Sequence, residues 1–237
     1  MTIEYGLQSK ITSVDTILLV HPSRYYMIGM DIECIGPLVE GVDHDYEKDK
    51  RHIAILTALF EKTKKNFEGL EQRFDSTKIH SLVNHYPSIL EFGNVIRADE
   101  NSRRYLPKSD SINLLNQGIR VMLGGGRWID CHAFVFNELV LDFLYSEAAS
   151  ENKLRILAPA NYIYNAASTI DEVLKREGKE EFLKVFRDDY LKGHYLQSDF
   201  QKKIAPFSHS LLFDGEVIVE HKTNSKKEFS LEVLSSI

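Results

Sequence analysis

The segment from Gly124 to His132 constrains the fold more than any other part of the chain. It joins the clearest strand signal, Ile119–Leu123, to the most apolar helical run, Ala133–Tyr145. A strand that passes through a glycine-rich turn into a helix is typical of α/β proteins, which bind ligands beyond the carboxyl ends of their strands. The sequence therefore predicts a strand–turn–helix unit whose turn carries functional groups.

Strand and helix signals also alternate on either side of this unit. One continuous apolar run, Thr16–Val20, is typical of a strand buried on both faces, and the other strand-like runs, of which Lys78–His85 is weaker, are separated from it by segments that read as helices. We expect strands at Thr16–Val20, Lys78–His85 and Lys153–Ala158, and helices over Glu47–Phe67 and Asp171–Lys192, the last interrupted near Gly178. The segment Ser88–Lys108 shows no convincing period and is expected to be irregular.

The C-terminal part of the chain follows a different pattern. Asp214 and Gly215 separate two strand-like runs, Ser210–Phe213 and Glu216–Glu220. Two alternating runs joined by Asp-Gly are a strong signal for a hairpin with a type I′ turn. A further run, Phe229–Leu234, extends this hairpin to an antiparallel meander.

Together these elements predict an α/β fold, because strands separated by helices pair in parallel and carry helices on both faces of the sheet. We expect a three-layer sandwich with a mostly parallel central sheet and a C-terminal antiparallel meander. A chain of 237 residues can bury one substantial core. The prediction is one α/β domain over residues 1–237, in which residues 208–237 form the meander.

Composition narrows the classes of partner. The net charge is −6, and Lys and Arg are scattered along the chain, so no basic patch for nucleic acid is evident. No apolar window reaches the length of a membrane span, and the first ten residues lack the apolar core of a signal peptide. Cys34 and Cys131 lie far apart, which suits a reducing cytoplasm. We expect a cytoplasmic protein with a small-molecule ligand and no nucleic-acid or membrane partner; the sequence leaves open whether it forms a homo-oligomer.

Cys131 is the candidate nucleophile. It is predicted near a helix N-terminus, where unpaired amide N–H groups and the helix dipole lower the pKa of a thiol. Its titratable candidate partners are Asp130, His132 and His21. His132 follows Cys131 directly, and adjacent side chains on a helix point about 100° apart, so His21 at the end of another strand is the better-placed base.

The glycines before Cys131 form the candidate ligand-binding loop. Gly124, Gly125 and Gly126 allow positive φ and close backbone approach, so their N–H groups could form an oxyanion hole or an anion nest. Arg127 and Trp128 follow them and complete the predicted ligand-binding set. The same glycines are also compatible with a simple tight turn.

One resemblance sharpens these expectations. From Ile119 to Phe136 the chain has a strand, a glycine, a short loop and a cysteine that opens an apolar helix, and Pro107-Lys108-Ser109 precedes this stretch. The arrangement resembles the nucleophile region of isochorismatase-like cysteine hydrolases, over less than a fifth of the chain. The resemblance implies that Cys131 attacks an amide or related carbon and that Lys108 is a catalytic lysine. That family places an aspartate base after its first strand, where this chain has His21.

Two other functions stay open. The first is a transferase in which Gly124–Gly126 and Arg127 hold a nucleotide's phosphates, with Cys131 structural and with Asp43 and Asp45 of the triplet Asp43-His44-Asp45 as further candidates. The triplet could bind a divalent ion or form a solvated loop, so no metal site and no cofactor are assigned. Arg103-Arg104 could similarly clamp an anion or lie in solvent. The second is a non-catalytic α/β binding module.

Overall fold

The computed structural model describes residues 10–11, 13–22, 61, 64–83, 91–98, 104–126, 128, 131–147, 152–163, 166–191 and 199–235. These residues contain the strands β1 (Thr16–Val20), β2 (Ile79–Val83), β3 (Asn94–Arg97), β4 (Arg120–Gly125), β5 (Lys153–Pro159), β6 (Ser208–Phe213), β7 (Glu216–His221) and β8 (Glu228–Leu234). The helices are α4 (Lys108–Gln117), α5 (Cys131–Tyr145), α6 (Ala166–Leu191) and α7 (Phe200–Ile204), the short 3-10 helices η1 (Ser76–Lys78) and η2 (Ala160–Tyr162), and helical residues 64–71.

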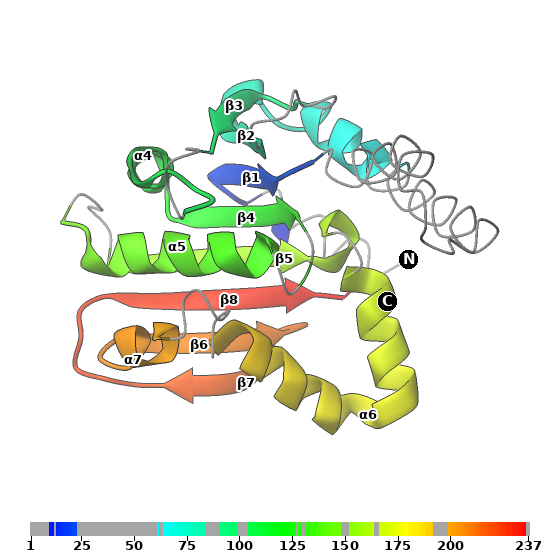
Figure 1. The fold of residues 1–237 in the computed structure, drawn as a ribbon, viewed down its shortest axis with the longest axis vertical. Helices are drawn as coiled ribbons and strands as arrows, with labels where there is room; N and C mark the ends of the chain where they lie inside the picture. The colour runs from blue at the N-terminus through cyan, green and yellow to red at the C-terminus, as the bar shows by residue number, and fades with distance from the viewer. Residues whose placement is uncertain are drawn as a thin grey trace, which may run out of the picture.

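The eight strands form one sheet in the order β3-β2-β1-β4-β5-β8-β6-β7 (Figure 1). All neighbouring strands are parallel except β6 and β7, which pair antiparallel. The predicted α/β fold with a mostly parallel sheet is therefore confirmed. The predicted strands at Thr16–Val20, Lys78–His85, Ile119–Leu123 and Lys153–Ala158 correspond to β1, β2, β4 and β5.

The layers follow from the apolar runs. Every residue of β1 is buried, and its side chains alternate between two cores: Leu18 and Val20 face the core beneath α4–α7, whereas Ile17 and Leu19 face the opposite core. Phe67, in the helical segment 64–71, packs in that second core. A strand buried on both faces has no position that faces solvent, which explains why β1 is apolar from Ile17 to Val20.

α6 is the longest described helix, and the predicted interruption near Gly178 is confirmed. Gly178 has φ 81°, which is outside helical geometry and joins two helical pieces across a kink. Glycine reaches this region without the steric penalty that a Cβ imposes. Among the described residues, no helix combines the length and the apolar character that crossing a membrane requires.

The prediction that Ser88–Lys108 is irregular was wrong over part of its length, because β3 lies within it. β3 is a four-residue edge strand in which only Ile96 is buried. One inward-facing apolar residue gives neither an apolar run nor a detectable alternation, so the segment carries little strand signal.

The predicted meander also needs correction. Asp214 and Gly215 have φ 51° and 84°, as a type I′ turn requires, so the β6–β7 hairpin is confirmed. β8, however, does not pair with β7: it lies between β5 and β6 and is parallel to both. Its alternate residues, among them Leu231, are buried in the core beneath α5 and α6. At the sheet edge beyond β7, whose residues are all exposed or half-buried, the same side chains would face water.

Lys227 anchors the start of β8. Its ammonium group donates hydrogen bonds to the carbonyl oxygen of Phe143, at 2.8 Å, and to that of Ser146. Carbonyls in the last turn of a helix have no intrahelical partner and carry partial negative charge, so a lysine there both satisfies and stabilises them. This contact fastens the β7–β8 connection to the C-terminal end of α5.

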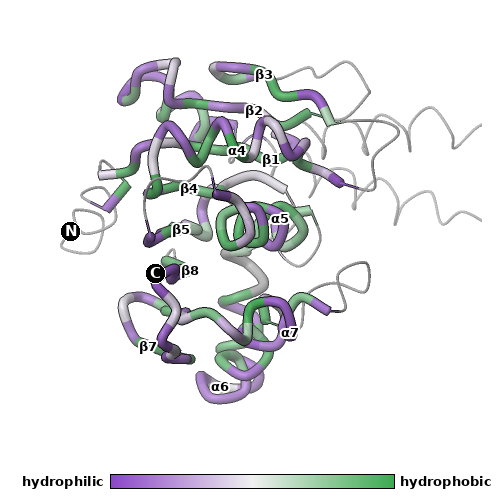
Figure 2. Tube along the Cα trace, turned by 90° about the vertical axis from the view of Figure 1, so that its left-hand side faces the viewer, coloured by the Kyte–Doolittle hydropathy of each residue, from purple (hydrophilic) through white to green (hydrophobic). Residues whose placement is uncertain are grey.

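The two faces of the sheet are covered unequally. In Figure 2 the strands are seen nearly end-on, with α5 and α7 on one side of β5, β8 and β7. Buried residues alternate with more exposed ones along the first part of β5, β6 and β8, because one face of these strands packs under the helices and the other is accessible. The β1–β4 half of the sheet is thus enclosed, whereas the β8–β6 half has one open face.

Candidate functional site

The carboxyl ends of β1 and β4 define the candidate site. From β1 the chain adds β2 and β3 on one side of the sheet, and from β4 it adds β5 on the other. Connections that leave two adjacent strands in opposite directions create a crevice, the topological switch point where α/β proteins bind ligands. His21 follows β1 directly, Gly124 and Gly125 end β4, and Cys131 is the first residue of α5. The fold therefore brings three of the sequence-predicted features to one edge of the sheet.

Gly124 and Gly125 belong to the strand itself and not to a loop. Gly125 is opposite Val20 in the parallel β1–β4 ladder. A Cβ on Gly125 would lie 2.3 Å from the carbonyl oxygen of Val20, and its φ of 69° disfavours any other residue. Close contact between the two central strands thus accounts for glycine at this position.

Gly126 links the end of β1 to the first turn of α5. A Cβ on Gly126 would lie 3.0 Å from the backbone N of His132 and 3.2 Å from Cγ1 of Val20. Val20 precedes His21 and His132 follows Cys131 along the chain. Gly126 therefore lies between the side chain of Val20, next to the candidate base, and the backbone of His132, next to the candidate nucleophile.

Cys131 lies at the start of α5 and its side chain is fully buried. It packs in the larger core with apolar neighbours such as Val135. The first four N–H groups of a helix lack intrahelical partners, so amides of this turn are available to stabilise negative charge. Position favours a reactive thiolate, whereas burial requires solvent or substrate to reach the sulfur before it can react.

His21 has an uncommon backbone conformation. Its φ is 45°, and the only other described non-glycine residue with positive φ is Asp214 in the hairpin turn. Its N–H donates to the carbonyl of Leu82 at 2.7 Å, and its ring centre lies 5.6 Å from that of Tyr105 in an edge contact. Conformations of this kind cost free energy and occur preferentially at functional sites.

His132 is held in the core by both ring nitrogens. Nε2 donates to the carbonyl of Leu123 at 3.3 Å, and Nδ1 accepts from the hydroxyl of Tyr190 at 3.1 Å. Burial lowers the pKa of His132 to about 4, against the smaller opposing effect of the Leu123 carbonyl. A neutral ring with both nitrogens engaged connects β4, α5 and α6, and this arrangement gives His132 a structural role in the described residues.

Trp128 is also a core residue, with 4% of its surface exposed. Its ring stacks on Phe186 and His132 with centre distances of 5.8 and 6.3 Å, and it meets Tyr190 edge-on at 5.3 Å. These contacts pack α6 against the start of α5. Arg127 and Asp130 on either side of it lie outside the described residues, so their predicted roles stay predictions.

Lys108 is the first residue of α4 and is exposed. Within the described part of the chain, no interaction joins it to Cys131 or His21. The turn before it is fixed to α5, because the two carboxylate oxygens of Glu138 accept the N–H groups of Tyr105 and Leu106 at 3.0 and 2.7 Å.

Arg104 makes a second connection between the turn before α4 and α5. Its guanidinium binds both oxygens of Asp142, at 3.0 Å for one of them, and its Nε donates to the carbonyl of Leu106 at 3.0 Å. Arg104 is thus committed to an ion pair with α5, which differs from both alternatives that the sequence left open for it.

Tyr105, Glu138 and Asp142 were not identified from the sequence. The ring of Tyr105 stacks on Phe134 at 5.0 Å and contacts the ring of His21, so it lies between the end of β1 and the start of α5. A signal did exist: Glu138 and Asp142 lie four residues apart, and hence on one face, in the most apolar helix. Buried acids in such a helix indicate a hydrogen-bonded partner.

Glu138 has a strongly perturbed carboxyl group. Burial raises its pKa to about 7, although the N–H groups of Leu106 and Tyr105 and the charge of Arg104 oppose this effect. The carboxyl group therefore titrates near neutrality, and its protonation state is linked to how the turn around Tyr105 is held.

The triplet Asp43-His44-Asp45 and Arg103 lie outside the described residues. Among the residues that are described, no group of three or more His, Cys, Asp or Glu side chains could hold a metal ion. Comparison with known proteins gives no family for the chain: no protein-family model matches it, and no curated protein or solved structure is significantly similar.

Proposed function

We propose that this chain is a cysteine-nucleophile enzyme, a hydrolase or acyl transferase that acts at a C–N or thioester-like carbon of a small polar or anionic metabolite. The observation that carries the proposal is that His21, Gly126 and the first turn of α5 all lie at the switch point of the sheet, with Gly126 next to Val20 and His132. A buried core cysteine has no need of this location, whereas a nucleophile benefits from it.

The chemistry assigns one task to each group. The sulfur of Cys131 gives up its proton to the imidazole of His21 and attacks the acyl carbon, forming a C–S bond. Backbone N–H groups of Gly126 and of the first turn of α5 stabilise the oxyanion. The tetrahedral species collapses, the C–N or C–S bond to the leaving group breaks, and His21 returns the proton to it.

The second half returns the enzyme to its starting state. Water, or an acceptor in the case of transfer, gives a proton to His21 and attacks the thioester carbon, and the released thiolate recovers the proton. Tyr105 bounds the space next to His21, so it is the side chain we expect to contact the substrate.

A reporter ester tests the proposal without knowledge of the substrate. With p-nitrophenyl acetate the protein should release a burst of p-nitrophenolate and carry an acetyl group on Cys131, identified by peptide mass spectrometry. Cys131→Ser should abolish the burst, and His21→Asn should slow it by about 10²-fold or more because no base accepts the thiol proton. Cys34→Ser is the matched control and should leave both readouts unchanged. An acetyl group found only on Cys34 or on lysines would reject the proposal.

A second candidate is a transferase that binds a nucleotide or phosphate at the same edge. Gly125 and Gly126 both have positive φ, 69° and 64°, and they precede the N-terminal turn of α5. Such a backbone can cradle a phosphate. Thermal stabilisation by ATP with Mg²⁺, retained in Cys131→Ser, would favour this candidate over cysteine chemistry.

A further inference from the structure

The open face of the β8–β6 half of the sheet carries a polar groove. A cavity of about 390 Å³ lies across β4, β5, β8 and β6, a volume suited to a small metabolite. It lies on the flat face of the sheet, whereas the candidate cysteine site lies beyond the ends of β1 and β4. We call this cavity the sheet-face groove; it is lined by Lys10, Ser13, Val14, Arg120, Lys153, Arg155, Ile156, Leu157, Ser210, Leu212, Ser230 and Glu232.

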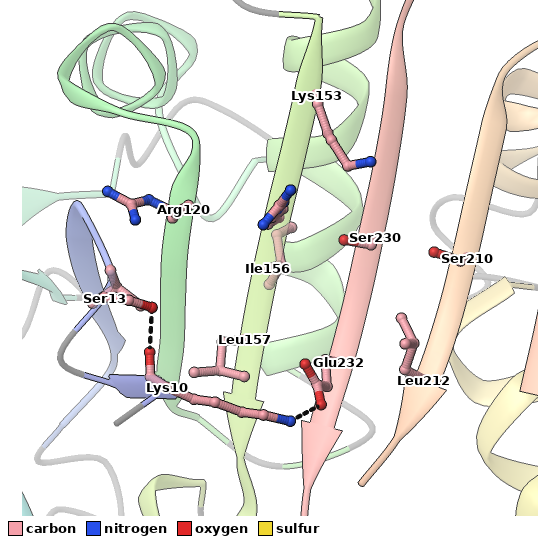
Figure 3. Close-up of a pocket in the computed structure, with 12 residues that line it drawn as sticks. Lys10, Ser13, Arg120, Lys153, Ile156, Leu157, Ser210, Leu212, Ser230 and Glu232 are labelled. Carbon is pink, nitrogen blue, oxygen red and sulfur yellow. Dashed lines mark hydrogen bonds and ion pairs between the residues drawn. The ribbon is translucent and has the colours of Figure 1, made fainter. Parts of the chain in front are cut away.

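Strand register places donor groups in one row across the groove. Arg155 is opposite Ser230 in the β5–β8 ladder, and Ser230 is opposite Ser210 in the β8–β6 ladder. Adjacent strands are about 4.8 Å apart, so three consecutive partners span the width of a small ligand. Figure 3 shows the hydroxyl oxygens of Ser230 and Ser210 at the same level on the two strands.

Most charges around the groove neutralise one another. Lys10 pairs with Glu232 at 2.5 Å, at the bottom of the groove as drawn in Figure 3. Arg120 binds the carboxylate of Asp15, a residue that does not line the groove.

Lys153 pairs with Glu228 in the same way. Arg155 is the exception: it is exposed, and within the described residues its guanidinium has neither an ion pair nor a side-chain hydrogen bond. Within the same residues, the hydroxyls of Ser210 and Ser230 likewise have no protein partner. The centre of the groove thus presents one positive charge and two hydroxyl donors.

We propose that the sheet-face groove binds a small organic anion, whose carboxylate or phosphate group is held by Arg155 with Ser210 and Ser230. A guanidinium fork matches two oxygens of such a group, and hydroxyls donate to the remaining oxygen atoms. In the next row toward the strand ends, Leu157 and Leu212 flank Glu232 and offer apolar surface. The ligand therefore combines one anionic group with a short apolar portion.

Calorimetric titration of the full chain at low ionic strength tests this site. Phenyl phosphate and benzoate are the two probes, because they share an apolar ring and differ in the anionic group. At least one should bind saturably with a Kd below about 1 mM, and the tighter probe identifies the class of anion. Absence of saturable binding by both would overturn the proposal.

Three variants assign the binding to the groove. Arg155→Gln should weaken it by at least about tenfold, since one charge-assisted fork is lost. Arg97→Gln, an exposed strand arginine at the other end of the sheet, is the matched control and should bind like the parent protein. Cys131→Ser should also bind normally, which separates this site from the proposed catalysis. Equal affinity of the Arg155→Gln variant and the parent would overturn the assignment, and a thermal unfolding curve confirms that each variant is folded.

Discussion

The two halves of the sheet differ in how many of their faces are buried and in where their functional groups lie. Around β1 and β4 both faces are buried, strands approach so closely that Gly125 cannot carry a side chain, and the functional groups lie at the strand ends. Around β5, β8 and β6 one face is buried and the other carries Arg155, Ser230 and Ser210 in a row. Enclosure leaves a strand only its end for chemistry, whereas an open face makes the middle of a strand available.

The first prediction compares glycines with similar φ in the two halves. Gly125→Ala should lower the free energy of unfolding by about 4 kcal/mol, since the new Cβ strains the backbone and clashes with Val20. Gly215→Ala, in the β6–β7 turn, should cost only about 1–2 kcal/mol, because the nearest atom outside its chain neighbours, Oε1 of Glu232, would lie 3.9 Å from the new Cβ. Urea unfolding measures both. Equal losses would mean that the central strands are not packed as tightly as described.

The second prediction concerns a histidine buried in the core. His132 has a pKa of about 4 in the folded protein against an ordinary value of 6.5, so it contributes stability in full above pH 6.5 and loses it as the pH falls toward 4. Over that window the loss amounts to about 3 kcal/mol.

One variant isolates this effect from other titrating groups. His132→Gln should flatten the dependence of unfolding free energy on pH between 4 and 6.5. A parental pH slope in the His132→Gln variant would show that the ring is not held neutral in the core.

The third prediction compares serines on strands of the two halves. The hydroxyl of Ser81 on β2 is buried, donating to the carbonyl of Phe92 and accepting from its N–H, both at 2.8 Å. Ser81→Ala should therefore cost about 2 kcal/mol, because two backbone groups lose their partner. Ser230→Ala on the open face should change stability by less than about 0.5 kcal/mol. A large loss at Ser230 would imply that this face is enclosed.

Local pattern sufficed to predict the enclosed half of the fold. β1 was located from a continuous apolar run, because burial on both faces leaves no position that faces solvent. β4 and β5 each carry an exposed arginine, Arg120 and Arg155, and were located from the apolar residues that follow it. The position of β8 could not be read in this way, since its alternation is equally compatible with an antiparallel neighbour. Only the need to bury Leu231 beneath α5 and α6 selects its place between β5 and β6.

The candidate site was predicted only in part from the sequence. His21 was identified because it follows a strong strand signal, and Cys131 because it begins the helix after another. Tyr105 and Glu138 were missed because their roles depend on a long-range contact between a turn and a helix 32 residues or more away in sequence. The burial of His132 likewise depends on Tyr190, far along the chain.

The reactivity of Cys131 decides the central claim most directly. Iodoacetamide alkylation of the native protein is measured against pH by peptide mass spectrometry, with Cys34 as internal comparison. We predict that Cys131 reacts in the folded protein with a midpoint well below the ordinary thiol value of about 8.5, as a thiolate at a helix N-terminus should. Protection of Cys131 until the protein unfolds would contradict its proposed role as a nucleophile and make this cysteine part of the core.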